Sequence, residues 1–186
     1  MDVEAIIEKV LAELSIPNVP FFDNGIDVAC FEYISPRERE LTVKEEKIRD
    51  IAYGLKLGKS NAVRYAASCI AKFLPVGSIL IPIPSSSGDT SANLILAKEI
   101  AKYKKVQIVD LLKRSNKVTP SHELRKQGKE IPNDHHQFSI DDKSALVGKK
   151  VYMIDNVITS GATMNAGRKA IGGFAKGIAF AKAKDK

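Results

Sequence analysis

The sequence predicts an α/β protein with a mainly parallel sheet flanked by helices. Short apolar runs without polar interruption recur along the chain, which is typical of strands buried on both faces of a parallel sheet. Segments with apolar residues at helical spacing lie between these runs. Strand and helix therefore alternate from Ser78 onward, and this alternation indicates one α/β domain over the 186 residues.

In the second half of the chain the expected elements follow one another closely. Two helices are expected, at 91–103 and at 161–173, and the second ends at a glycine pair, as helices commonly do. Four strands are expected, in the order 78–83 (SILIPI), 106–112 (VQIVDLL), 149–155 (KKVYMID) and 177–183 (GIAFAKA).

The first half of the chain is read in the same way. Apolar residues at helical spacing predict an amphipathic helix over residues 2–14, whose apolar face suggests a homodimer. A β-rich stretch predicts a strand over 26–35. Helical spacing returns around residues 48–55 and again over 61–74, so two helices are expected there.

Composition narrows the class of protein. The formal charge of +7 permits an anionic partner, either nucleic acid or a phosphorylated small molecule, although the lysines are scattered. Cys30 and Cys69 form no C-x-x-C pair, so we expect reduced core residues and no zinc ribbon. No apolar stretch approaches the ~20 residues that span a bilayer. The first residues lack the features of a signal peptide, and a cytoplasmic protein without a membrane partner is expected.

One segment breaks the alternation. Residues 113–139 are long, polar and basic, without a clear period. Loops longer than ~12–15 residues are usually functional lids or disordered. We expect a long flexible lid loop, with a disordered surface loop as the alternative. The adjacent His135 and His136 lack a spaced set of further ligands, and a solvated or hinge position is expected for them.

A candidate site follows the third of these strands, in VYMIDNVITSGAT at 151–163. Ligands of open parallel sheets bind beyond the carboxyl ends of the strands, where Asp155 and Asn156 would lie. The turn TSGAT at 159–163 would lead into a helix, and N–H groups at a helix start bind phosphate. The acid and the amide could then hold the hydroxyls of a ribose whose 5-phosphate lies in that turn. The alternative is that Asp155 caps the turn and TSGAT is only an N-cap.

This stretch resembles the phosphoribosyl-pyrophosphate (PRPP) binding motif of type I phosphoribosyltransferases, which has an apolar strand, two acids, two apolar residues and T-[TS]-G-x-[TS]. ILIPIPSSSGDTSANLILA, from 79 to 97, is similar to the strand, pyrophosphate loop and helix of that family. The likeness covers roughly residues 48–181. Within it, the segment before the PRPP motif resembles the ComF-like branch, at Leu112, Arg114, Thr119, Leu124, Asn133 and Phe138.

The resemblance implies the type I phosphoribosyltransferase fold, with a small N-terminal hood at 1–47 and a PRPP-binding core at 48–186. It also implies transfer of a phosphoribosyl group from PRPP to a nitrogen acceptor such as a nucleobase, with release of pyrophosphate. Magnesium would bridge substrate oxygens, with Asp155 as one candidate protein ligand. The implied sites are Asp155 and Asn156 for catalysis; Thr159, Ser160, Gly161, Ala162 and Thr163 for the 5-phosphate; Ser85, Ser86, Ser87 and Gly88 for pyrophosphate; and Lys113, Arg114, Arg125 and Lys126 on the lid.

The chain also departs from the family pattern. Asn156 stands where the second acid is usual, and His122 and Lys129 replace a glutamine and an arginine. The ComF-like zinc ribbon is absent. A basic R-G-F-N stretch is missing after Gly88, so a cation for pyrophosphate must come from elsewhere, for example from the lid. Two alternatives therefore stay open: a non-catalytic PRPP or nucleotide sensor, and a ComF-like accessory of DNA uptake or repair.

Overall fold

The structure is a computed structural model that describes residues 14–35, 39–115, 119, 124, 127–128 and 135–183. The helix predicted over 2–14 therefore lies almost wholly outside the described residues. None of the described helices is both long and apolar enough to cross a membrane.

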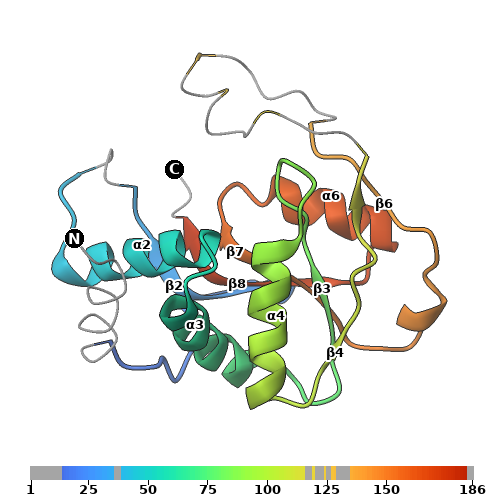
Figure 1. Cartoon of the computed structure of the whole chain (residues 1–186), viewed down its shortest axis with the longest axis horizontal. Coiled ribbons are helices and arrows are strands. Elements are labelled where there is room, and N and C mark those ends of the chain that lie inside the picture. Colours follow the sequence, from blue (N-terminus) through green and yellow to red (C-terminus); the bar gives the residue numbers. More distant parts are fainter. Residues whose placement is uncertain are drawn as a thin grey trace.

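A six-stranded mixed sheet forms the centre of the molecule (Figure 1). Its order is β1-β2-β8-β7-β3-β4, and only the β1–β2 pair is antiparallel. The α/β fold with a mostly parallel sheet is thus as predicted. The strands are β1 (Phe22–Asp23), β2 (Asp27–Tyr33), β3 (Ile79–Pro82), β4 (Gln107–Ile108), β7 (Val151–Ile158) and β8 (Lys176–Ala183).

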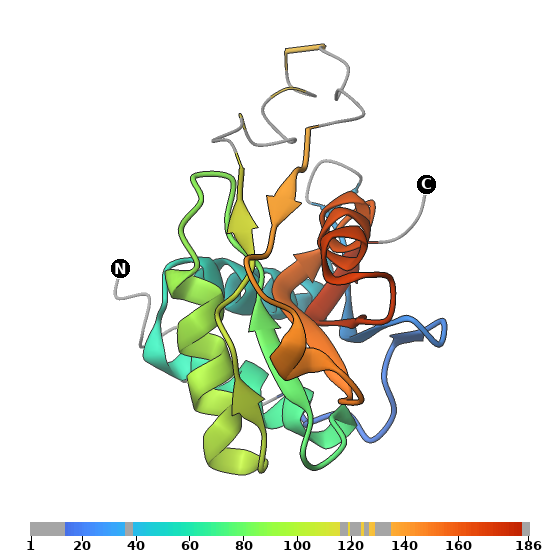
Figure 2. The same cartoon turned by 90° about the vertical axis from the view of Figure 1, so that its right-hand side faces the viewer.

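Helices cover both faces of this sheet, and Figure 2 shows α4 and α6 on opposite sides of it. Along each buried strand the side chains alternate between the faces. On β7, Tyr152 and Ile154 pack in the cluster with α2, α3 and α4, whereas Val151 and Met153 pack in the cluster with α6. The helices are α2 (Val43–Lys56), α3 (Ser60–Phe73), α4 (Ser91–Tyr103), α6 (Ala162–Ile171) and the 3₁₀ turn η1 (Ser144–Leu146).

Local sequence explains where α2 begins. Thr42 and Glu45 form a capping box: the Glu45 N–H donates to Thr42 Oγ1 (3.4 Å), and the Thr42 N–H donates to Glu45 Oε2 (2.8 Å). The expected boundary between hood and core, at residue 47, falls inside this helix. Residues of β2 on one side of the boundary and of α2 and α3 on the other pack in one hydrophobic cluster.

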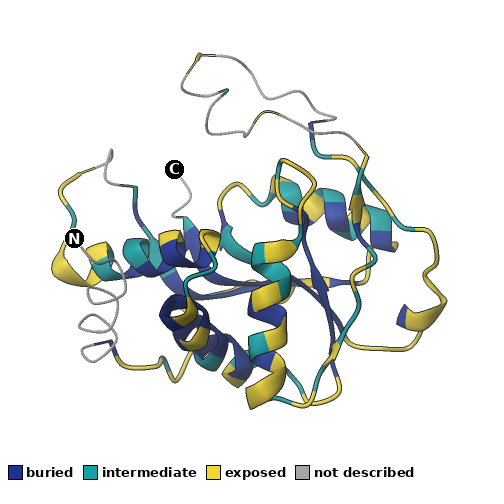
Figure 3. Cartoon of the chain, in the orientation of Figure 1, coloured by how far each residue is buried: buried dark blue, intermediate teal, exposed yellow. Residues whose placement is uncertain are grey.

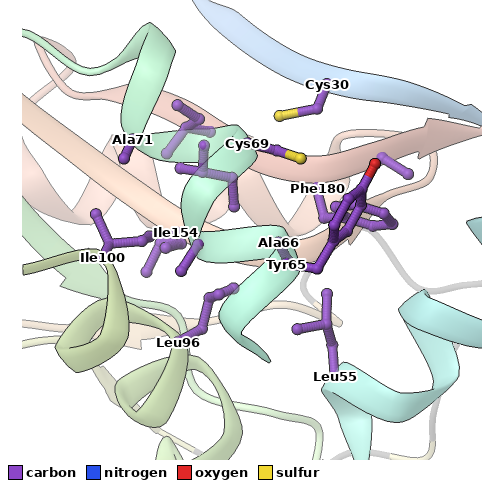
Figure 4. Packing of buried hydrophobic residues seen from close by; sticks show 14 of the residues in the cluster. Cys30, Leu55, Tyr65, Ala66, Cys69, Ala71, Leu96, Ile100, Ile154 and Phe180 are labelled. Atoms are coloured by element: carbon purple, nitrogen blue, oxygen red, sulfur yellow. The ribbon is translucent and has the colours of Figure 1, made fainter. Parts of the chain in front are cut away.

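The larger hydrophobic cluster, between the sheet and α2, α3 and α4, consists of buried side chains. It includes Tyr65, Cys69 and Phe180, and Figure 4 shows these side chains packed between α3 and the sheet. Cys30 and Cys69 are buried free thiols, as predicted, and burial raises the pKa of both. Figure 3 shows buried residues along the sheet and the inner helix faces, with exposed residues along the loops at the strand ends.

Two predicted strand lengths are wrong. The second strand, expected over 106–112, is confined to Gln107–Ile108, because β4 lies at the sheet edge and pairs only with Ile79 and Leu80. The third strand was expected to end at Asp155, but β7 continues to Ile158. The longer neighbour β8 pairs with β7 as far as Ile158, whereas β3 pairs with it only as far as Ile154.

The order of the strands creates a switch point between β3 and β7. From β3 the chain crosses through α4 to β4, and from β7 it crosses through α6 to β8, in the opposite direction along the sheet. In open α/β sheets, ligands bind at the carboxyl ends of the strands beside such a point. The loop after β3 and the turn after β7 both lie there.

Candidate functional site

Asp155 occupies the first position of β7 beyond its pairing with β3. The last backbone hydrogen bond between the two strands runs from the Ile83 N–H to the Ile154 carbonyl (3.1 Å). Past this bond the Asn156 N–H has no strand partner from β3, and Asp155 Oδ1 accepts it at 2.8 Å. The early end of β3 thus leaves this N–H group without a partner on β3, and the Asp155 side chain satisfies it.

Only one of the two oxygens of the Asp155 carboxylate accepts hydrogen bonds from described residues. Oδ1 also accepts a hydrogen bond from Asn93 Nδ2 (3.3 Å), whereas Oδ2 has no hydrogen-bond partner within the described part of the chain. Burial raises the pKa of this carboxyl from 3.8 to about 6, against the lowering effects of the two hydrogen bonds and of the Arg114 charge. At neutral pH the site therefore holds a carboxylate that is costly to keep ionised and has an oxygen left for a ligand.

Asn156 offers the complementary group. Its Oδ1 accepts the Val157 N–H at 2.8 Å, so the amide oxygen is occupied and the NH₂ group is the part left to donate. Asp155 thus offers an acceptor and Asn156 a donor, and a hydroxyl group can both donate and accept.

The turn after β7 is open at its centre. Gly161 has a φ of 75°, the left-handed region that favours glycine, and it precedes α6 as the N-cap residue. No atom would lie within 4 Å of a Cβ placed there. The N–H groups of Gly161, Ala162 and Thr163 donate no hydrogen bond to a described residue, and no described side chain caps the helix.

These amides and the hydroxyls of Thr159, Ser160 and Thr163 therefore lie together at the start of a helix. Thr159 and Ser160 are exposed. Unpaired N–H groups and the positive end of the helix dipole favour an anion at this position. The five residues predicted to bind the 5-phosphate are thus brought together in one turn.

The serine loop after β3 is folded on itself. The Ser85 N–H donates to the Asp89 carbonyl (2.8 Å), the Gly88 N–H donates to the Ser85 carbonyl (3.0 Å), and the hydroxyls of Ser85 and Ser87 lie 2.7 Å apart. Two of the loop amides are thus already used inside the loop. Ser86 and Ser87 keep amides without such a bond among the described residues.

Arg114 ties the base of the lid to the serine loop. Its Nε donates to the Ser85 carbonyl (2.9 Å), and its guanidinium lies over the Phe138 ring, 4.6 Å from the centroid. Arg114 belongs to β5 (Lys113–Arg114), which pairs with β6 (Phe138–Ser139) in a short antiparallel ribbon. Sequence reasoning expected only a loop here, because strands of two residues leave no periodic signal.

His136 completes the surroundings of this guanidinium. Its Nδ1 lies 3.3 Å from Arg114 Nη1, and desolvation, the Arg114 charge and His135 lower its pKa to about 4. His136 is therefore neutral at pH 7 and accepts from the guanidinium. Contrary to the solvated position expected for the pair, His135 is buried and His136 is partly buried. Their rings meet edge to face, 4.8 Å apart.

The other predicted lid cation that the structure describes, Lys113, is paired away from this loop. Lys113 forms an ion pair with Asp141, in the loop that follows β6. Arg125 and Lys126 lie outside the described residues. Of the predicted lid cations within the described residues, Arg114 is the one that contacts the serine loop.

The oxygen donors near Asp155 suit magnesium only in part. No group of three or more His, Cys, Asp or Glu side chains is gathered for a metal among the described residues. Asp155 Oδ2 and the serine hydroxyls are hard oxygen donors, which fit a magnesium ion held mainly by substrate oxygens and water. They do not form a cage for such an ion.

Sequence reasoning missed Asn93 altogether. This residue lies on α4, and its NH₂ group bridges the Ile83 carbonyl (2.8 Å) and Asp155 (3.3 Å). An amide in the first turn of a helix is a weak helix former, and that was the only signal in the sequence.

Comparison with protein-family models gives no match, and a search of curated proteins also finds no matching relative.

Proposed function

We propose that this protein binds PRPP at the switch point between β3 and β7 and transfers its phosphoribosyl group to a nitrogen acceptor, as type I phosphoribosyltransferases do. One observation supports the proposal above all. Asp155, whose Oδ2 accepts no hydrogen bond from a described residue, lies four to eight residues before the turn at 159–163, where backbone N–H groups meet the start of a helix. A 5-phosphorylated ribose has a diol and a phosphate that suit these two groups.

In this proposal each group of the ligand has its own contacts. The amides and hydroxyls of 159–163 bind the 5-phosphate, and Asp155 Oδ2 with Asn156 Nδ2 binds the ribose hydroxyls. The pyrophosphate lies between the serine loop and Arg114, whose charge replaces the basic stretch missing after Gly88. Asp155 Oδ2 is the candidate protein ligand for a magnesium ion, which would supply positive charge to offset that of the pyrophosphate.

The reaction exchanges one bond at the ribose C1. The C1–O bond to pyrophosphate breaks with its electron pair, a nitrogen lone pair of the acceptor forms the new bond to C1, and the acceptor loses its proton to solvent. Positive charge grows on the ribose during this exchange. The ionised Asp155 stabilises that charge because it lies in a partly desolvated position. Arg114 stabilises the departing pyrophosphate.

A non-catalytic PRPP sensor is the second candidate, and Asn156 favours it. An amide supplies no negative charge to the developing cation, so the site has one carboxylate for stabilisation. Binding of the ribose does not need the second charge. The two candidates therefore share the same binding contacts and differ only in turnover.

Calorimetry and a pyrophosphate assay separate these candidates. We expect PRPP with magnesium to bind the full chain, and a panel of nucleobases and other nitrogen acceptors to give pyrophosphate release with at least one member. Tight PRPP binding without release would favour the sensor. No binding of PRPP or ribose 5-phosphate would overturn both.

Gly161→Val tests the phosphate turn directly. A branched side chain at a φ of 75° strains the backbone and fills the space beside the amides. We expect affinity for ribose 5-phosphate to fall about 100-fold in calorimetry, which is the loss of one or two charge-assisted hydrogen bonds. Gly148→Val is the matched control, because Gly148 has a φ of 70° in an exposed turn before β7. Equal affinity in the two variants would show that phosphate does not bind in this turn.

A further inference from the structure

Asn93 makes contacts that a helix residue does not need for its own helix. It lies in the first turn of α4, yet its side chain caps no N–H group of that helix. Its Nδ2 instead donates to the Ile83 carbonyl and to Asp155 Oδ1. Both partners are acceptors, so the orientation of the amide is fixed: the NH₂ group, with its two hydrogens, must face them.

The two acceptors belong to different parts of the site. Ile83 is the residue between β3 and the serine loop, and its N–H makes the last backbone bond from that segment to β7. Asp155 follows on β7, where the sheet has opened. One NH₂ group therefore spans the gap at the switch point and joins the start of the serine loop to the acid.

We propose that Asn93 is a positioning residue: it fixes the Asp155 carboxylate so that Oδ2 faces the ligand, and it couples that carboxylate to the serine loop. Its part in sugar binding rests on the proposed function, whereas its hold on Asp155 does not. With Asn93 and the Asn156 N–H both on Oδ1, rotation of the carboxylate would break two hydrogen bonds.

The surroundings of Asp155 show why this donor matters. Three groups favour its ionised form: the Asn156 N–H from its own strand, Asn93 from α4 and the charge of Arg114 from β5. His136, behind Arg114, is neutral at pH 7 and adds no charge. Removal of Asn93 leaves burial opposed by two groups instead of three, so the acid becomes harder to ionise.

The test is the pKa of the Asp155 carboxyl, followed by ¹³C NMR in the full chain as pH is varied. In Asn93→Ala we expect this pKa to rise by about one unit, because a hydrogen bond to the charged form is lost. The matched control is Asn165→Ala, since Asn165 is an exposed helix amide whose partner is Arg168. The control should leave the Asp155 pKa unchanged.

A second variant guards against failure of the first to fold. Asn93→Asp keeps the size of the side chain, removes the donor and adds a like charge, so it should raise the Asp155 pKa further than Asn93→Ala. A variant that melts at a lower temperature but keeps the wild-type Asp155 pKa would show that Asn93 only ties α4 to β3, and it would overturn the proposal.

Binding gives an independent readout. We expect Asn93→Ala to weaken ribose 5-phosphate binding about twofold at pH 7, because about half of the acid is then protonated, with the loss shrinking as pH rises and the acid ionises. A pKa shift in a protein that binds no ribose 5-phosphate even as wild type would leave the positioning role intact and refute the proposed function. An unshifted pKa with wild-type binding would refute the positioning role alone.

Discussion

Asp155→Asn is expected to stabilise the folded chain at pH 7.5 while it removes most affinity for ribose 5-phosphate. The folded state raises the pKa of this carboxyl from 3.8 to about 6. The folded protein thus binds a proton that the unfolded chain releases between these two values. Above pH 6 the ionised acid costs up to about 3 kcal/mol of folding free energy. Asparagine keeps the two hydrogen-bond contacts of Oδ1 and carries no charge to desolvate.

The sign of this effect depends on pH, and the dependence is the check. An acid with a raised pKa lowers stability as pH rises from 3.8 to 6, so wild type and Asp155→Asn should converge below about pH 3.8 and differ fully above pH 6. Urea unfolding at pH 7.5 and at the lowest pH where both variants fold measures the difference.

Asp142→Asn is the control for a charge change at an aspartate. Asp142 accepts from the Ser144 N–H (2.8 Å) and hydroxyl (2.6 Å), and these bonds lower its pKa. Its ionised form is favoured by the fold, so the asparagine variant should gain no stability at pH 7.5. A stability gain in Asp142→Asn equal to that in Asp155→Asn, or none in Asp155→Asn, would mean that the Asp155 carboxyl is not desolvated.

An acid that weakens the fold is easier to explain as a binding group than as a structural one. A simple cap would be stabilised by its hydrogen bonds, as Asp142 is. At Asp155 the hydrogen bonds do not offset burial, and one oxygen has no protein donor among the described residues. Groups whose pKa is shifted by burial cluster at functional sites. This comparison favours the binding interpretation over the capping alternative that the sequence left open.

The elements that the sequence predicted well are those with long periodic or apolar signals. Helices α3, α4 and α6 and strands β3 and β8 follow the predicted ranges closely. The ribbon of β5 and β6 was missed, because pairs of two-residue strands depend on tertiary contacts such as that of Arg114 with Phe138. The excess length predicted for β4 has a similar cause. Apolar residues such as Leu112 are buried beneath α6 without being part of the sheet.

The candidate site shows the same difference between residues that are close in sequence and residues that only the fold brings together. Residues adjacent in sequence, such as Asp155 with the turn at 159–163, were recognisable as a motif. Asn93, Arg114 and His136 come from three separate segments, and their meeting depends on strand order, which the sequence does not state. A motif therefore pointed to the groups that we propose for sugar binding, while the groups packed against them required the fold.

Gly177→Ala is expected to destabilise the protein by about 3 kcal/mol, through an ion pair that the substitution does not directly remove. Gly177 is buried on β8 beside Asp27 of β2. A Cβ at 177 would overlap the Asp27 carboxylate, which is ion-paired with Arg168 on α6. Both of these charged side chains are largely buried, with 12% and 13% of their surface exposed, so separating them leaves a charge without compensation.

Gly167→Ala provides the matched comparison. Gly167 is also buried, and a Cβ there would lie 2.9 Å from Met153 Sδ. A thioether at the end of a flexible side chain can move aside, and alanine adds up to about 1 kcal/mol of helix propensity on α6. We therefore expect Gly167→Ala to lie within about 1 kcal/mol of wild type in urea unfolding. An equal loss in both variants would point to general overpacking rather than to the ion pair.

A double-mutant cycle identifies the ion pair as the cause. Asp27→Ala alone should cost about 3 kcal/mol, because Arg168 stays buried beside the space that the carboxylate leaves. In that background Gly177→Ala meets no carboxylate, so its further cost should fall below about 1 kcal/mol, a strongly non-additive result. Additive costs would mean that a methyl group at 177 acts on the sheet itself. Arg168 belongs to α6, the helix that begins after the turn at 159–161. If the ion pair holds this helix in place, Gly177→Ala and Asp27→Ala should each also weaken the binding of ribose 5-phosphate.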